Sequence, residues 1–203
     1  MIEGLAKPWG ELALYFKYAS ENTIPAEYPS VSLWLFKMAN IFGEQYFTLV
    51  WYFLVATASL AVVWLVKRLR GNPYVYLAGV LPLGGLFWDR FDVFPALFTI
   101  LAIYLAKSKY PIFAFNALSV GVLLKVYPII LLPVLVLMMI RDKQYAKLLI
   151  GLFVFCLPLA FMNWDFISFH KDRGIQIESI RALPKLLNKE SVVEYKHNTF
   201  EIK

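Results

Sequence analysis

An uncharged run, YFTLVWYFLVATASLAVVWLV, occupies residues 46–66 of the chain. About 20 apolar residues in a helix cross the ~30 Å hydrocarbon core of a bilayer, so this run predicts a transmembrane helix. The run ends in Lys67-Arg68-Leu69-Arg70, and the next three residues, Gly71-Asn72-Pro73, predict a turn. The fold is therefore expected to be built around a membrane span.

The composition of the whole chain agrees with this expectation. Of its 203 residues, 60% are hydrophobic and 17% are aromatic, whereas a soluble domain is about 45–50% apolar. The net charge is +6, but the basic residues punctuate apolar runs instead of forming one basic face, which argues against nucleic-acid binding. The single cysteine, Cys156, lies in an apolar run and cannot form a disulfide within the chain.

Five shorter apolar runs follow the first span. Residues 74–87 and 94–106 flank the charged segment Trp88-Asp89-Arg90-Phe91-Asp92, residues 112–124 and 129–140 flank Lys125-Val126-Tyr127-Pro128, and the last run is 148–164. A helix of about 12–14 residues is ~18–21 Å long. Short helices are tolerated at membrane depth where they are buried in protein or line a cavity. We therefore predict an all-α, polytopic transmembrane helix bundle with about six crossings, several of them short or broken.

The orientation follows from the charge of the short loops. Three of these loops carry eight basic residues and one acid, Asp142, and the positive-inside rule places such loops in the cytoplasm. Six crossings then place the charged segment 88–92 and Lys125 on the outer face. They divide the chain into an outer loop with an interfacial helix (1–45), a transmembrane domain (46–164) and an outer-face tail (165–203). The basic residues are Lys67, Arg68, Arg70, Lys107, Lys109, Arg141, Lys143 and Lys147.

The first 45 residues contain neither a signal peptide nor a span, although the short apolar stretch 31–42 suits an interfacial or half-buried helix. Such a polar segment needs a preceding helix to reach the outer face. The sequence therefore predicts that the chain is a fragment from which an upstream transmembrane helix is missing.

Lys125 is the most conspicuous polar residue, because a charge inside an apolar run costs about 2.5–3.5 kcal/mol at mid-bilayer. One interpretation is that its side chain extends to the interface. The other is that it binds an anion such as a lipid phosphate. Pro128 is expected to break the helix just after it and to free backbone groups there.

Other polar residues carry two interpretations each. Arg90 and Asp92 form either a solvated turn or part of a site at the membrane surface. His170 and Arg173 would share a helix face, either to hold a phosphate or as part of an interfacial amphipathic helix. Glu11 and the more distant Glu27 are acid or base candidates, although isolated loop carboxylates are usually just solvated.

No zinc spacing, phosphate-binding loop, dinucleotide motif or Ser-His-Asp signature is present. With two histidines in the chain, a histidine-rich metal site is excluded. No metal or other cofactor is therefore predicted.

Five motifs, in order and covering most of the chain, resemble a known family. The chain looks like a polyprenyl-phosphate-sugar-dependent glycosyltransferase of the C superfamily, most like glycosyltransferase family 87 (the DUF2029 type). The motifs are Glu11-Leu12-Ala13-Leu14-Tyr15-Phe16 with Tyr18-Ala19, Glu27-Tyr28-Pro29, Arg90-Phe91-Asp92-Val93-Phe94-Pro95-Ala96, Lys125-Val126-Tyr127-Pro128 with Ile129-Ile130-Leu131-Leu132-Pro133, and His170-Lys171-Asp172-Arg173-Gly174 with Ile175-Gln176-Ile177-Glu178-Ser179.

The resemblance implies a hexosyltransferase with an outward-facing site, which moves a mannose-like hexose from a polyprenyl- or dolichyl-phosphate donor to a lipid or glycan acceptor. The catalytic base would be Glu11, where the family usually carries an aspartate, or Asp92. The donor phosphate would be held by Arg90, Lys125, Tyr127, His170 and Arg173, and the site loops would include Glu27, Tyr28 and Glu178.

Two alternatives remain open from the sequence. A transporter also uses charged residues and broken helices near the bilayer midplane, which fits Lys125 and Pro128. An inactive fragment or a non-enzymatic membrane subunit would explain the expected absence of terminal helices.

Overall fold

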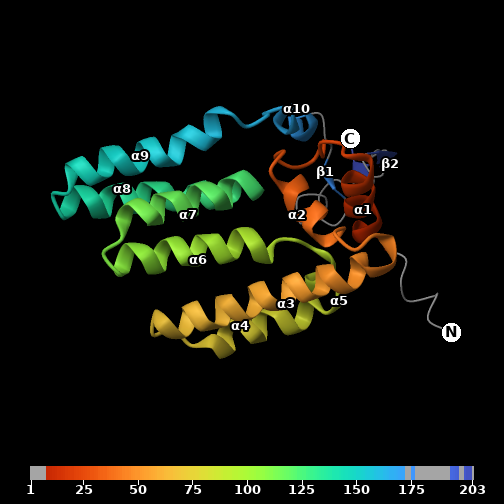
Figure 1. The fold of residues 1–203 in the computed structure, drawn as a ribbon, viewed down its shortest axis with the longest axis horizontal. Helices are drawn as coiled ribbons and strands as arrows, with labels where there is room; N and C mark the ends of the chain where they lie inside the picture. Colours follow the sequence, from red (N-terminus) through yellow and green to blue (C-terminus); the bar gives the residue numbers. More distant parts are fainter. Residues whose placement is uncertain (1–7, 172–174, 177–192, 197–198, 203) are drawn as a thin grey trace. The chain divides into compact units, whose positions relative to one another are not determined.

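The computed structural model describes residues 8–171, 175–176, 193–196 and 199–202, with the side chains of residues 8–169 (Figure 1). The chain divides into two compact units, Met1–Asn163 and Trp164–Lys203. In its described residues the first unit contains helices and no strand, and the second combines a short helix with three short strands.

The predicted first span is helix α3 (Glu44–Arg68), which is two residues longer at each end than the uncharged run. Lys67 and Arg68 occupy its last turn, where cations are favoured by the helix dipole. Among the described residues, α3 is the one helix long and apolar enough to cross a membrane, with a mean hydropathy of 2.2. Only 28% of its most apolar window is buried, whereas the core helix of a soluble protein would be mostly buried.

Each of the five shorter apolar runs is also helical, as predicted. All five are shorter than α3, so their length alone does not confirm six crossings. Prolines near their first residues start several of these helices, because a proline at that position gives up no intrahelical hydrogen bond. The elements are α4 (Pro73–Val80), the 3₁₀ helix η1 (Leu81–Leu83), α5 (Gly85–Asp89), α6 (Val93–Lys107), α7 (Pro111–Leu124), the 3₁₀ helix η2 (Tyr127–Leu131), α8 (Leu132–Arg141) and α9 (Tyr145–Ala160).

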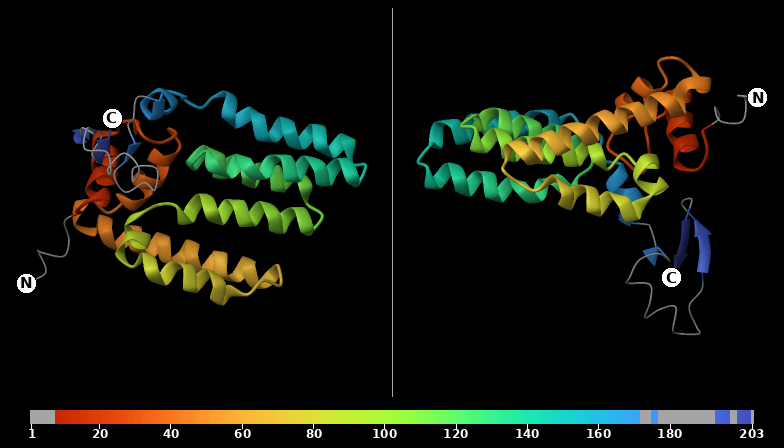
Figure 2. Two further views of the ribbon diagram at one scale, coloured as in Figure 1. Left: turned by 180° about the vertical axis from the view of Figure 1, so that it is seen from behind. Right: turned by 90° about the horizontal axis from the view of Figure 1, so that it is seen from below.

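These helices form a bundle in which α7 is central. Helix α6 packs against α3 and α7, and α7 packs against α9 (Figures 1 and 2). Helices α7 and α9 approach closely at Gly151, where an added Cβ would lie 2.4 Å from Cδ2 of Phe115. Ser119 links the same two helices, because its hydroxyl donates a hydrogen bond of 2.9 Å to the carbonyl oxygen of Phe155.

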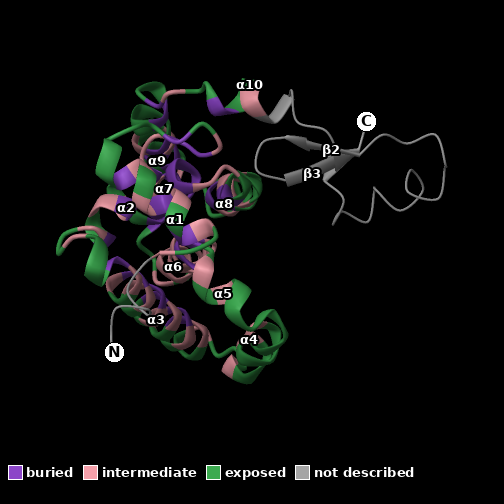
Figure 3. Ribbon diagram, turned by 90° about the vertical axis from the view of Figure 1, so that its right-hand side faces the viewer, coloured by how far each residue is buried: buried purple, intermediate pink, exposed green. Residues whose placement is uncertain are grey.

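The outer faces of the bundle are strongly apolar. Figure 3 shows exposed residues along α4 and α8 and buried ones along α7. Leu60 of α3 is 71% exposed, Leu81 of η1 79% and Ile130 of η2 78%. Many other large apolar side chains of these helices are exposed as well, more than is usual for a soluble monomer.

The bundle has two chemically different ends. Since the helices run in alternating directions, the turns at residues 69–72, 108–110 and 142–144 lie at one end, and the segments 88–92 and 125–127 lie at the other (Figures 1 and 2). The first end carries the eight basic residues listed above.

Two N-terminal helices, α1 (Glu11–Glu21) and α2 (Ser32–Ala39), pack against each other and against α3. Helix α2 is half-buried, as expected for the 31–42 stretch: Phe36 is fully buried while Trp34 is 71% exposed. The ring of Phe36 stacks on that of Tyr15 at 4.4 Å. Trp51 of α3 joins this aromatic core.

The second unit corrects the all-α prediction in part. It contains α10 (Phe166–Lys171) and three antiparallel strands in the order β1-β3-β2. The strands are β1 (Ile175–Gln176), β2 (Val193–Lys196) and β3 (Thr199–Ile202). In β2 (VEYK) and β3 (TFEI), apolar and polar residues alternate with the period of two that is typical of strands. The spacing of His170 and Arg173 predicts a helix in this tail, so the period of two is a correction to that prediction.

Candidate functional site

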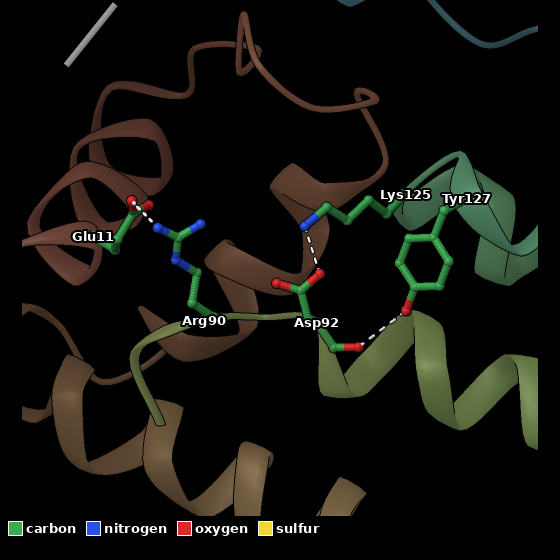
Figure 4. A network of polar contacts seen from close by, with 5 residues as sticks. All are labelled: Glu11, Arg90, Asp92, Lys125 and Tyr127. Atoms are coloured by element: carbon green, nitrogen blue, oxygen red, sulfur yellow. Dashed lines mark hydrogen bonds and ion pairs between the residues drawn. The ribbon is translucent and has the colours of Figure 1, made fainter. Parts of the chain in front are cut away.

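Two ion pairs lie at the end of the bundle that is opposite the basic turns (Figure 4). Nη2 of Arg90 is 3.4 Å from Oε1 of Glu11, and Nζ of Lys125 is 2.5 Å from Oδ1 of Asp92. The hydroxyl of Tyr127 donates to the backbone oxygen of Asp92 at 3.4 Å. Segments that are far apart in the sequence, α1, the 90–92 segment and the 125–127 segment, therefore contribute to one polar cluster.

The 90–92 segment is held between α5 and α6. Arg90 ends α5 in an extended conformation, and Asp92 precedes the first residue of α6. Between them, Phe91 is fully buried, and its ring lies 4.8 Å from the ring of Tyr28. Because Phe91 is buried in the aromatic core, its two charged neighbours are fixed at the surface on either side of it.

Helix α3 holds the two residues that precede Arg90. The indole Nε1 of Trp51 donates to the carbonyl oxygen of Trp88 at 2.9 Å, and the hydroxyl of Tyr52 donates to Oδ1 of Asp89 at 3.0 Å. Neither Trp51 nor Tyr52 was among the site residues predicted from the sequence. The signal was available, since each is an aromatic residue with a polar atom that needs a partner inside an apolar span.

Lys125 lies at the C-terminal end of α7, where the chain becomes extended, and not in the middle of a helix. The predicted helix break before Pro128 is thus confirmed. An ammonium at this position is favoured by the dipole of α7. Its Nζ also lies 5.3 Å from the centre of the Phe91 ring, which faces the same polar cluster.

The four charged side chains are all partly exposed, between 32% and 46%. Burial is the largest single influence on the pKa of Arg90 and lowers it, but Glu11, Tyr15, Tyr28 and Asp92 together raise it by more, so the pKa is raised overall and the guanidinium remains charged. Arg90 does not form an ion pair with Asp92 within the turn. Arg90 instead pairs with Glu11 from another helix, and the second oxygen of Glu11, Oε2, is buried without a hydrogen-bond partner among the described residues.

An apolar groove of about 620 Å³ ends at this cluster. Three polar side chains, Arg90, Asp92 and Tyr127, lie at its lip, whereas neither Glu11 nor Lys125 lines it. Tyr76, whose hydroxyl is hydrogen-bonded to that of Ser59 at 2.9 Å, adds a polar atom to the wall. The remaining lining residues are Gly79, Val80, Leu83, Leu86, Phe87, Val93 and Ala96.

Tyr28 and Glu27, predicted as site-loop residues, lie next to the aromatic core. Tyr28 is buried, and its ring packs edge-on against Phe91. Burial raises the pKa of the Tyr28 hydroxyl, and the carboxylates of Glu11 and Glu27 raise it further. Neither Tyr28 nor Glu27 lines the groove, so their place is behind the 90–92 segment.

The side chains of the three site residues predicted in the tail lie outside the described part of the chain. His170 lies in α10, but its side chain is outside the described part of the chain. Arg173 and Glu178 lie wholly outside the described residues.

Within the described residues, no group of three or more His, Cys, Asp or Glu side chains could hold a metal ion. The cluster contains two cations, Arg90 and Lys125, of a kind that can bind an anion, next to two carboxylates of a kind that can accept a proton.

Comparisons with protein-family models, with curated proteins and with solved structures found no match to this chain.

Proposed function

We propose that this chain is a membrane glycosyltransferase that moves a hexose, mannose-like, from a polyprenyl- or dolichyl-phosphate donor to a lipid or glycan acceptor on the outer or lumenal face. The observation that carries the proposal is the apolar groove, whose lip holds Arg90, Asp92 and Tyr127. A lipid-linked sugar phosphate needs such a combination of an apolar channel and a cationic end.

The proposal includes a membrane domain of about six crossings. It is supported by the exposed apolar side chains on α3, η1 and η2 and by the opposite chemistry of the two bundle ends. The 15 residues of α6 make a helix of about 22 Å. That is short of the hydrocarbon thickness, but a short helix can be accommodated by local thinning of the bilayer or by packing against longer neighbours such as α3.

The groove suits the lipid part of the donor. Its volume of about 620 Å³ lies within the ~300–1,000 Å³ typical of ligand pockets. Its walls come from α4, η1, α5 and α6, so a polyprenyl chain would lie along apolar side chains. The guanidinium of Arg90 can donate two parallel hydrogen bonds to a phosphate, and the ammonium of Lys125 adds a second positive charge.

In the proposed reaction, an acceptor hydroxyl oxygen attacks the anomeric carbon from the side opposite the phosphate. The bond between that carbon and the phosphate oxygen breaks, and the lipid phosphate leaves with the electron pair while a carboxylate takes the hydroxyl proton. Arg90 and Lys125 would stabilise the charge that develops on the leaving phosphate.

Asp92 is favoured over Glu11 as the base, because Asp92 lines the groove and Glu11 does not. Glu11 would instead position Arg90 through their ion pair. A phosphate bound by Lys125 would compete with Asp92 for the ammonium and leave that carboxylate free to accept a proton. Glu27 and Tyr28 would belong to the site loop, and the roles of His170, Arg173 and Glu178 remain predictions from the family resemblance.

The test is a transfer assay. The protein is purified in detergent and offered radiolabelled polyprenyl-phosphate sugars, with membrane extract as the source of acceptor. Lys125→Met is expected to abolish transfer, whereas Lys17→Met, an exposed lysine of α1, should keep it. Asp92→Asn is expected to lower kcat by about 10²–10⁴-fold, as for loss of a general base. Glu11→Gln should act mainly on the KM for the donor.

Gel filtration of each variant separates loss of activity from loss of fold. Wild-type transfer by Lys125→Met would remove Lys125 from the site. Flux of a solute through proteoliposomes without sugar transfer would favour the transporter, and a folded protein that neither binds nor transfers would favour an inactive subunit.

A further inference from the structure

The three turns at the basic end of the bundle share one backbone motif. Helices α3, α6 and α8 are each followed, two positions after their last residue, by a residue with positive φ: Arg70 (60°), Lys109 (65°) and Lys143 (55°). In each turn, the amide of this residue bonds to the carbonyl three residues back, and the next amide bonds to the carbonyl five residues back. This pair of bonds defines the Schellman motif.

The residue type at these three positions runs against local preference. The left-handed position of a Schellman motif is usually glycine, sometimes asparagine, because in other residues Cβ crowds the following carbonyl oxygen. At the end of α1 the left-handed position is filled by Asn22, as the rule expects, and the other positive-φ residues described, Gly10, Gly43 and Gly84, precede helices. Among the described residues, lysine or arginine occupies such a strained position at the basic end alone, in all three of its turns.

All three side chains are exposed, and none of them forms an ion pair among the described residues. The acid of this end, Asp142, accepts a hydrogen bond from Nε of Arg141. The positive charge of Arg70, Lys109 and Lys143 is therefore available to an external anion, and it lies at helix C-termini, where the backbone alone would repel anions.

One exposed tyrosine follows each of the three turns, so the tyrosines lie at the same end of the bundle as the basic residues. Tyr74, Tyr110 and Tyr145 follow the three basic residues by one to four positions and are 74%, 59% and 57% exposed. The guanidinium of Arg68 lies 5.1 Å from the ring of Trp64 at the same end. Tyrosine and tryptophan are enriched at the level of lipid headgroups, with lysine and arginine just beyond them.

We propose that this end of the bundle is a docking surface for anionic phospholipid headgroups, which Arg70, Lys109 and Lys143 contact from the three turns. The inference rests on the membrane placement proposed above and not on sugar transfer. It accounts for the use of strained basic residues where glycine would form the same turn, since glycine would bind no phosphate.

The test measures lipid preference in bilayers. The full chain is reconstituted in phosphatidylcholine, and either brominated phosphatidylglycerol or brominated phosphatidylcholine is titrated in. Quenching of tryptophan fluorescence, to which Trp64 contributes at this end, gives the relative affinity of the two lipids. The wild type is expected to prefer phosphatidylglycerol, and the preference should weaken at high salt.

The decisive variant combines Arg70→Asn, Lys109→Asn and Lys143→Asn, because asparagine tolerates positive φ without charge. The preference for phosphatidylglycerol is expected to fall by up to about fivefold for each charge removed, while the melting temperature stays the same or rises. The charge-conserving triple Arg70→Lys, Lys109→Arg and Lys143→Arg should keep the preference. An Asn triple with wild-type preference would overturn the inference.

Failure of the protein to insert into liposomes would instead contradict the membrane placement on which both proposals rest. A protein that inserts and transfers sugar but shows no lipid preference would contradict the docking surface and leave the proposed sugar transfer standing.

Discussion

At the scale of single residues, uncharged side chains and helix ends hold the members of the charged cluster in place. Phe91 is fully buried between Arg90 and Asp92, and Lys125 lies at a helix end. Ion pairs as exposed as those of Arg90 and Lys125 contribute about 0–1 kcal/mol to stability. These pairs therefore contribute little to folding, which leaves Arg90 and Lys125 open to the ligand role proposed above.

A prediction at this scale concerns Tyr15, which is fully buried beside Tyr28 with no hydrogen bond of ordinary geometry for its hydroxyl oxygen. Tyr15→Phe should stabilise the fold by about 1 kcal/mol or more, because an unsatisfied buried hydroxyl costs about 1–3 kcal/mol. Thermal unfolding in detergent measures this, with the exposed Tyr46→Phe as the neutral control.

The same substitution tests a pH dependence. Burial, followed by Tyr28 and Glu11, raises the pKa of the Tyr15 hydroxyl. A group whose pKa is raised on folding contributes stability below its unfolded pKa, which is near 10 for tyrosine. That contribution is lost as the pH rises above 10 toward the folded value. Tyr15→Phe should therefore unfold less readily above pH 10 than the wild type, and an unchanged alkaline profile would contradict the assignment.

At the scale of the elements, the close approach of α7 and α9 determines how the bundle packs. The hydrogen atom at Gly151 lets Phe115 fit between the two helices, and Ser119 bonds across the same contact. A sequence pattern indicates that glycine is present in an apolar helix, but it does not say which ring lies against it.

Gly151→Ala is the prediction for this contact. An added Cβ would lie 2.4 Å from the Phe115 ring, and overpacking of this kind costs about 1–3 kcal/mol. Gly79→Ala is the matched control, since no atom lies within 4 Å of its added Cβ and alanine is the better helix former. Melting temperatures in one detergent compare them, and an equal effect of the two would show that α7 and α9 do not pack at Gly151.

At the scale of the whole molecule, the long helix α3 and the five shorter apolar helices that follow it place the basic turns and the charged cluster at opposite ends of one bundle (Figure 1). One of the six is long enough to span by itself. The proposed topology therefore depends on the others spanning as packed neighbours.

Cysteine accessibility tests that topology in a Cys156→Ala background, which removes the exposed native thiol. A membrane-impermeant maleimide applied to intact cells should label Glu21→Cys and not Ser108→Cys. After permeabilisation both should be labelled. Labelling of both sites in intact cells would place the two ends on one side of the membrane and contradict the proposed crossings.

The helices could be read from the sequence because apolar run length and proline position are local properties. The run at 46–66 predicts α3, and Pro128 predicts the end of α7 near Lys125. The alternation of apolar and polar residues in β2 and β3 is a local property as well. It was missed because both strands are short and lie in a polar tail.

The pairing of the charges was decided by the tertiary structure. The sequence predicted that Glu11, Arg90, Asp92 and Lys125 lie on one side of the expected membrane. It did not predict which carboxylate pairs with which cation. Those partners are separated by 79 and 33 positions in the pairs Glu11–Arg90 and Asp92–Lys125. Only packing brings such distant residues together. The groove has the same origin, since its walls come from α4, α5 and α6, and no single segment contains it.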